Sequence, residues 1–178
     1  MRNCNASPPE NAGNTKQKRF KVYKTGVGLD IHPAFTRRDF AKIYLIAGNA
    51  SIHACGKTIY TSEPILLFEP LVPYSLHEIV TDTSFTCLFS QDLLHSELCS
   101  KVYHKLMAFA ASSEPVIFSL DSKQKNFITF VFEQIILEQD TAYTFSHELF
   151  CNYMNLIFHE VLKKTTGNKT GYQLFHLN

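Results

Sequence analysis

Three histidines, His32, His53 and His77, are the residues of this chain best suited by type to hold a transition metal. Such a site needs several nitrogen or oxygen ligands that converge at about 2.0–2.2 Å from the ion. The spacing of the three histidines matches no metal-binding motif. We therefore interpret them as surface or strand-end residues and expect no metal ion, with a displaced metal site as the alternative.

Two pairs of neighbouring residues carry groups that enzymes use. His159-Glu160 begins like the helix of a zinc protease, but Lys163 stands where the second histidine of that motif belongs. Ser146 and His147 lie side by side in a predicted helix. Neighbouring helical residues do not face each other, so these two cannot act as nucleophile and base. Neither pair predicts an enzyme.

Cysteine usage and hydropathy indicate the cellular compartment. The chain has five cysteines, an odd number with no CxxC pair, which is typical of reduced thiols. No apolar signal segment opens the sequence, and no apolar run approaches the ~18 residues of a membrane span. We expect a cytoplasmic protein that does not enter the membrane.

Charge is distributed unevenly over the 178 residues, whose net charge is +1. Residues 1–24 hold six Lys/Arg and one Glu, whereas residues 25–178 hold eleven Lys/Arg and fifteen Asp/Glu. The small total argues against a chain-wide electrostatic grip on nucleic acid. We expect residues 1–18 to be a disordered basic leader. A basic arm that touches nucleic acid or a membrane surface is the alternative.

Short strands in the first half of the chain must position His53, His77 and the other polar side chains found there. About seven segments between residues 19 and 90 have strand character: 20–24, 40–47, 51–55, 57–60, 64–70, 75–80 and 84–89. Segment 40–47 is apolar on both faces, which predicts a central strand. Turn signals roughly every 8–12 residues are typical of an all-β sandwich or barrel.

After Ser90 the apolar period changes from two to about 3.6, which predicts helices. The expected elements are a helix over residues 95–110, a short β-like segment at 115–120, a helix from the N-cap Asp121 to about Gln139, and a helix from Ser146 to Lys164. We interpret residues 91–164 as a helical dimerisation region and residues 165–178 as a tail.

The last helix has two apolar stripes side by side. One consists of Leu149, Tyr153, Ile157 and Val161, and the other of Phe150, Met154, Phe158 and Leu162. One stripe is enough to cover a sheet, so the second needs another partner. That partner is either the preceding helix or a second copy of the chain. We predict a homodimer through Leu149, Tyr153, Ile157 and Val161.

Three segments resemble, in order, the N-terminal domain of AraC-family transcriptional regulators, and most of all the Bacteroidetes-type members. They are DFAKIYLI at residues 39–46, PLVPYS at 70–75 and NLIFHE at 155–160. The resemblance covers about residues 19–164. It implies a mainly β fold, with a cupin-like double-stranded β-helix (jelly-roll) barrel at residues 19–90 and an antiparallel helix pair after it. It also implies a small-molecule effector bound in the barrel.

In that family a pair of helix-turn-helix units follows and binds DNA. Only 14 residues follow Lys164 here, and a mean helix alone takes about 11–12 residues. We therefore expect contact with DNA only through a domain absent from this chain.

Metal-binding cupins supply a His-x-His pair and a glutamate from one strand region, and a further histidine from a later strand. By the resemblance, the pair would fall near Thr36, Arg37 and Arg38, and the later histidine near Tyr74. Arginine stays protonated and does not bind metal. We therefore expect neither a metal nor a cofactor, and a stand-alone cupin enzyme is the alternative.

A non-catalytic pocket is what these residues predict. We expect Tyr44, His53, Phe68 and Tyr74 to line it, with Arg38 at the mouth for an anionic group. The alternative for each is a place in the core, because a one-residue error in strand facing reverses every side chain. The predicted function is effector sensing and dimerisation in an AraC-type regulator. A ligand-free interaction module is a further alternative.

Overall fold

The computed structural model describes residues 19–25, 40–69, 74–78, 84–90, 93, 100–110 and 115–167. The described strands form two antiparallel sheets. The larger contains, in spatial order, β1 (Phe20–Thr25), β7 (Ser84–Ser90), β2 (Phe40–Ile46), β5 (Ile65–Phe68) and β8 (Val116–Ser119). The smaller contains β4 (Lys57–Thr61), β3 (Ala50–Ala54) and β6 (Tyr74–Glu78).

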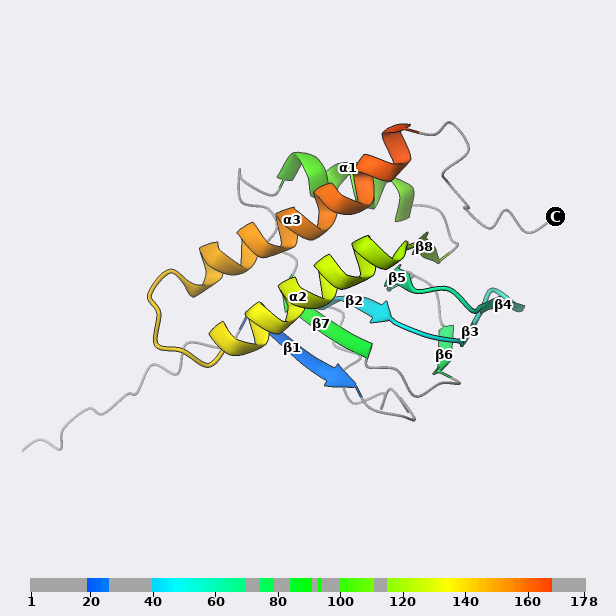
Figure 1. Ribbon diagram of the computed structural model, residues 1–178, viewed down its shortest axis with the longest axis horizontal. Coiled ribbons are helices and arrows are strands. Elements are labelled where there is room, and N and C mark those ends of the chain that lie inside the picture. The colour runs from blue at the N-terminus through cyan, green and yellow to red at the C-terminus, as the bar shows by residue number, and fades with distance from the viewer. Residues whose placement is uncertain are drawn as a thin grey trace, which may run out of the picture.

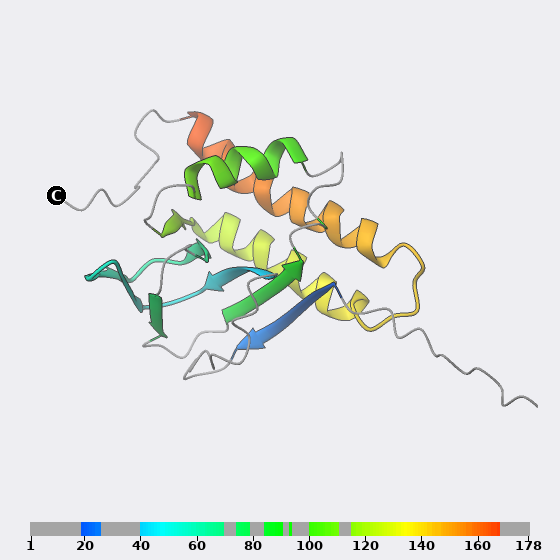
Figure 2. The same ribbon diagram turned by 180° about the vertical axis from the view of Figure 1, so that it is seen from behind.

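Three helices accompany the sheets: α1 (Ser100–Ala110), α2 (Ser122–Glu138) and α3 (Ser146–Gly167). They gather on one face of the five-stranded sheet, and α2 and α3 run antiparallel beside each other (Figures 1 and 2). The smaller sheet lies at the far end of β2 and β5 (Figure 1). The expected antiparallel helix pair is therefore present.

The central position of β2 is confirmed. It pairs with β7 on one side and β5 on the other. Ile43 and Leu45 point to the helices, and Tyr44 and Ile46 point to a second core shared with the smaller sheet. A strand buried on both faces must be apolar on both, as its sequence is.

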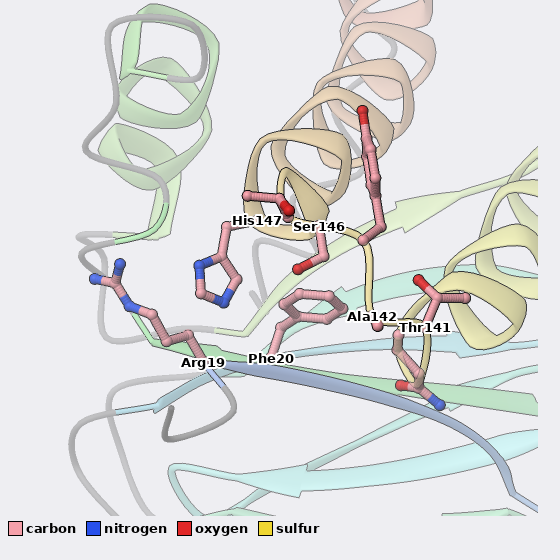
Figure 3. A pocket seen from close by; sticks show the side chains of 9 residues that line it. Arg19, Phe20, Thr141, Ala142, Ser146 and His147 are labelled. Atoms are coloured by element: carbon pink, nitrogen blue, oxygen red, sulfur yellow. The ribbon is translucent and has the colours of Figure 1, made fainter. Parts of the chain in front are cut away.

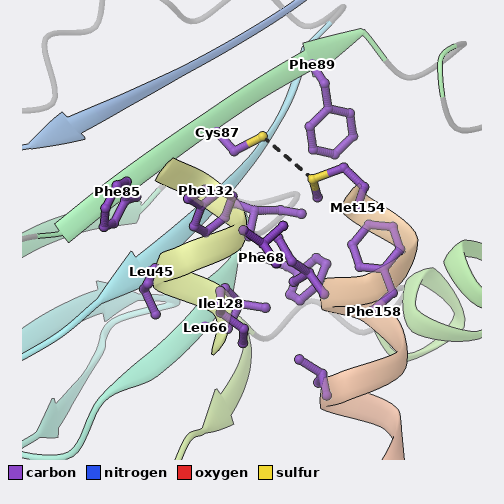
Figure 4. Packing of buried hydrophobic residues seen from close by; sticks show 14 of the residues in the cluster. Leu45, Leu66, Phe68, Phe85, Cys87, Phe89, Ile128, Phe132, Met154 and Phe158 are labelled. Carbon is purple, nitrogen blue, oxygen red and sulfur yellow. Dashed lines mark hydrogen bonds between the residues drawn. The ribbon is translucent and has the colours of Figure 1, made fainter. Parts of the chain in front are cut away.

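The core between the larger sheet and the helices is rich in aromatic rings (Figure 4). Phe85 of β7 stacks on Phe132 of α2, with ring centroids 5.7 Å apart. Cys87 points into the same core, and its Sγ lies 4.0 Å from the Sδ of Met154 (Figure 4). Burial raises the pKa of the Cys87 thiol, so this cysteine stays protonated and unreactive.

A local signal sets the N-terminal end of α2 where the sequence predicts it, whereas α3 continues to Gly167, past the predicted end at Lys164. Asp121 caps α2: its carboxylate accepts from the Gln124 backbone N–H at 2.9 Å, and the Gln124 side chain accepts from the Asp121 N–H at 3.2 Å. This reciprocal pair is a capping box. Gln124 also donates to the Glu160 carbonyl of α3 at 3.2 Å, which ties the two helices together.

The closed jelly-roll barrel expected over residues 19–90 is not confirmed. Among the described strands no ladder joins the two sheets, and β8, from the mainly helical half of the chain, pairs with β5 at the edge of the larger sheet. Strand patterns in a sequence predict where strands occur but not which strands pair. In the described part of the chain, no helix is long and apolar enough to cross a membrane.

Candidate functional site

Polar side chains occupy part of the inner face, by which we mean the face of the five-stranded sheet turned away from the helices. Tyr23, Thr86 and Tyr44 stand opposite one another across β1, β7 and β2. Next to Tyr44 the row becomes apolar, with Leu67 on β5 and Ile117 on β8. The inner face therefore has a polar half and an apolar half, and they meet at Tyr44.

Four residues form one hydrogen-bonded chain at this boundary, which we call the inner cluster: Lys42, Tyr44, Glu69 and Tyr74. The hydroxyls of Tyr44 and Tyr74 lie 2.7 Å apart. Tyr74 donates to Oε1 of Glu69 at 3.4 Å, and the Lys42 ammonium donates to the same oxygen at 2.7 Å. Either hydroxyl can donate in the Tyr44–Tyr74 bond, and whenever Tyr74 donates to Glu69 the donor to Tyr74 is Tyr44.

Sheet and loop geometry together build this cluster. Lys42 and Tyr44 are two residues apart on β2 and so point to the same face. Glu69 follows β5, and its backbone N–H donates to the Lys42 carbonyl at 2.9 Å. Tyr74 opens β6 of the smaller sheet, so the Tyr44–Tyr74 bond joins the two sheets.

Burial controls the electrostatics of the cluster. The side chain of Lys42 is 7% exposed and that of Glu69 is 23% exposed, so their ion pair lies in a region of low dielectric. Burial raises the pKa of both Tyr44 and Tyr74 far above 10, and for Tyr74 the nearby Tyr44 and Glu69 raise it further. Both phenols are therefore neutral hydrogen-bond donors at any physiological pH.

The cluster is suited to binding rather than to catalysis. Its phenols are too weakly acidic to supply a base or a nucleophile near neutral pH. In the described ranges, no three His, Cys, Asp or Glu side chains gather to hold a metal ion. What the cluster does supply is a set of fixed donors and acceptors at the edge of a packed apolar core that contains Ile46, Ile52, Leu67 and Leu76.

The structure brings together two of the five residues predicted to line a pocket, Tyr44 and Tyr74. His53 lies on the exposed side of β3, where its Nδ1 is 3.0 Å from the Thr58 hydroxyl. Phe68 points to the helices and contacts the rings of Phe118 and Phe158. Arg38 lies outside the described residues. Ile65 and Leu67, and not Phe68, are the residues of β5 that face inward, because facing alternates along a strand.

Sequence reasoning missed Lys42 and Glu69. The available signal was a lysine two residues before Tyr44 in an otherwise apolar strand, which places its charge on the inner face. A lysine that is only 6% exposed needs a partner. No local pattern identifies Glu69 as that partner, because 27 residues separate the two.

A separate cleft of about 310 Å³ opens between the start of β1 and the connection from α2 to α3 (Figure 3). Phe20 lies beneath His147 there, with ring centroids 6.0 Å apart, and Arg19 stands beside them (Figure 3). Thr141 and Ser146 add hydroxyls. None of Tyr44, His53, Phe68 and Tyr74 lines this cleft.

Two of the four residues predicted for the dimer interface are not on the surface. Ile157 is 0% exposed and Val161 is 2% exposed in a single chain, because this part of α3 packs into the core beneath the helices. Leu149 and Tyr153 are partly exposed. The exposed apolar side chains of the helix pair are Phe127, Phe130 and Leu137 on α2 and Leu156 on α3.

Comparison with known proteins finds distant structural likeness only. No protein-family model matches the chain, and no curated protein matches its sequence. Three solved structures of ToxT from Vibrio cholerae, an AraC-family regulator, are similar in part. They are a P21 crystal form (15% identity, TM-score 0.41), the apo K231A variant (12%, 0.49) and a complex with (E)-4-(8-methylnaphthalen-1-yl)but-3-enoic acid (16%, 0.43).

The alignments cover 87%, 84% and 83% of this chain but only 60%, 58% and 58% of the ToxT chains, in the same order. The chain thus spans well under two thirds of their length. Every TM-score is below 0.5, so these similarities by themselves decide neither fold nor function.

Proposed function

We propose that this chain is the effector-sensing and dimerisation domain of an AraC-type transcription regulator. In this role the inner cluster binds a small molecule, the outer face of α2 and α3 joins two copies, and DNA is bound by a further domain. The role is regulatory and not catalytic. The sequence resemblance at residues 39–46, 70–75 and 155–160 is one support for the proposal.

The observation that carries the effector-binding part is the buried inner cluster. A lysine and a carboxylate between two sheets add little to stability, because desolvation offsets most of their attraction. Ile and Leu of similar size pack the same interior a few residues away. A charged pair retained at the edge of that apolar core is the arrangement expected of a ligand site.

The dimerisation part is supported by an apolar surface. Phe127, Phe130 and Leu137 of α2 are exposed, and on the neighbouring α3 Leu156 is exposed and Leu149 is partly exposed. We call these five residues the outer helical face. Exposed apolar side chains gathered on two neighbouring helices are typical of an interaction site. A second copy can cover it symmetrically, because the same patch would meet itself.

A thermal-shift screen of sugars, organic acids, alcohols, amides and aromatic metabolites tests the proposal. A specific ligand raises the melting temperature of the wild-type chain by mass action. Tyr74→Phe removes the hydroxyl that links Tyr44 to Glu69 and should reduce the shift. Tyr60→Phe, on the smaller sheet at 73% exposure, is the matched control and should leave the shift unchanged. Failure of the whole library to shift the wild-type chain would instead favour a ligand-free interaction module.

A further inference from the structure

The inner cluster is balanced in charge before any ligand arrives. The ammonium of Lys42 is 2.7 Å from Oε1 of Glu69, so one positive and one negative charge neutralise each other. Tyr44 and Tyr74 are neutral, and they are hydrogen-bonded to each other and, through Tyr74, to Glu69. The cluster therefore offers no net charge to attract an ion.

Hydrogen-bonding capacity nevertheless remains on both members of the ion pair. An ammonium has three hydrogens, and among the described residues only Glu69 accepts one from Lys42. On Glu69 the bonds to Lys42 and Tyr74 both end on Oε1, and within the same part of the chain Oε2 has no partner. The Glu69 side chain keeps 23% exposure, so the cluster is open to a ligand from that side.

We infer that the effector presents to this cluster an uncharged group that both donates and accepts hydrogen bonds, carried on an apolar body. A hydroxyl or a primary carboxamide has this chemistry. The inference rests on the proposed function and names the ligand class for the same site. The group accepts from Lys42 and donates to Oε2 of Glu69, while the apolar body extends from the side on which Glu69 is 23% exposed.

Free acids and amines are disfavoured for the same electrostatic reason. A carboxylate bound to Lys42 would stand within a few ångströms of the Glu69 charge, and like charges repel strongly where the dielectric is low. A ligand ammonium would meet the charge of Lys42 in the same way. A neutral donor–acceptor group avoids both costs and leaves the ion pair intact.

The test compares matched acids, amides and alcohols on the same chain. Thermal shift and calorimetry would use cinnamate, cinnamamide and cinnamyl alcohol, then octanoate, octanamide and octanol, to cover a short aromatic and a longer aliphatic body. The wild-type chain should bind the amide or alcohol of at least one series about tenfold more tightly than the acid. Equal or tighter binding of the acids would overturn the inference.

If the charge argument holds, Glu69→Gln reverses the preference of the chain for amides and alcohols over acids. This variant removes the internal anion and leaves Lys42 as an unneutralised cation, so the acids should gain about tenfold in affinity and overtake the amides. Glu133→Gln is the matched control, because it removes the carboxylate of an exposed pair in which Lys24 Nζ and Glu133 Oε1 are also 2.7 Å apart. It should leave the preference for amides and alcohols over acids unchanged. An unchanged order in Glu69→Gln would count against the inference.

A double variant keeps the test open if Glu69→Gln does not fold. Lys42→Met/Glu69→Gln removes both charges and should lose amide and alcohol binding about tenfold. Unaltered amide binding in this variant would place the ligand elsewhere.

Absence of binding by all six probes to the wild-type chain overturns the inference. The proposed function stands if the wider screen still yields a ligand that depends on Tyr74, and fails if that screen is silent as well.

Discussion

At the scale of single residues, the chain's most unusual feature is the ion pair of Lys42 and Glu69. Its lysine is almost fully buried, and its glutamate accepts from both Lys42 and Tyr74 through one oxygen. Buried pairs of this kind add little net stability, but removal of one partner is costly because the other charge is left in an apolar surrounding. The pair should therefore respond very differently to single and double substitution.

Glu69→Leu should lower the free energy of unfolding by about 3 kcal/mol, because the Lys42 ammonium loses its partner. Lys42→Met/Glu69→Leu should recover most of that loss. Urea denaturation of the three chains measures both effects. Glu133→Leu breaks the exposed pair with Lys24 and should cost less than about 1 kcal/mol. A double variant as unstable as Glu69→Leu would refute the account of the pair.

The phenols of Tyr44 and Tyr74 make stability depend on alkaline pH. Their folded-state pKa is raised above the ordinary value of 10, chiefly by burial. The folded chain then holds protons that the unfolded chain releases, so this stabilisation is complete below about pH 10 and is lost as the pH rises further. Urea midpoints from about pH 8 to about pH 11 should fall steeply in the wild type. Tyr44→Phe/Tyr74→Phe should show a shallower fall, and an identical slope would contradict the assignment.

At the scale of elements, α2 is capped at its N-terminus and is hydrogen-bonded to both α3 and β1. Its N-terminus is capped by Asp121, its Gln124 side chain reaches α3, and Gln139 at its C-terminus accepts from the Val22 N–H of β1 at 2.9 Å. That last bond satisfies a backbone donor on the edge strand β1. Edge strands with unpaired donors invite pairing with other chains, so α2 also protects this edge of the sheet.

Loss of the cap should destabilise α2 and, with it, the whole core. Asp121→Ala removes the acceptor for the Gln124 N–H and should cost about 1 kcal/mol in urea unfolding. Asp121→Asn keeps a side-chain oxygen at the same place and should cost much less. Equal losses in the two variants would show that the cap geometry is not what stabilises this helix end.

At the scale of the whole molecule, the helices have one face in the core and one face exposed. Phe150, Met154 and Phe158 fill the core against the larger sheet, while Phe130 is 57% and Leu156 is 48% exposed. The proposed dimer uses only the second group. Substitutions on the two faces should therefore have separable consequences.

Phe130→Glu/Leu156→Glu should give a folded monomer, because charges on the outer helical face cannot be buried between two copies without a partner. Size-exclusion chromatography with light scattering measures the mass, and circular dichroism checks the fold. Ile157→Glu should instead unfold the chain, since that side chain is 0% exposed. Tyr60→Glu, distant on β4, should leave the mass unchanged. A wild-type chain that is monomeric at high micromolar concentration would contradict the dimer.

The elements were readable from the sequence, because their signals are local. The alternation or continuity of apolar residues predicts the strands, and the β-like pattern of residues 115–120 corresponds to β8. Asp121 was identified as the N-cap of α2 from its place before the apolar repeat. In each case the deciding interactions lie within a few residues along the chain.

Only the tertiary structure decided which elements meet. Whether the eight described strands close into a barrel or divide into two sheets depends on pairings between distant segments, such as β1 with β7, which no local pattern encodes. The same holds for the inner cluster: Tyr44 and Tyr74 were singled out by residue type, but their partners Lys42 and Glu69 emerged only when β2, β5 and β6 were brought together. Local sequence patterns determined the individual strands and helices. The burial of apolar side chains determined which of these elements lie next to each other, because burial depends on long-range contacts that no local pattern specifies.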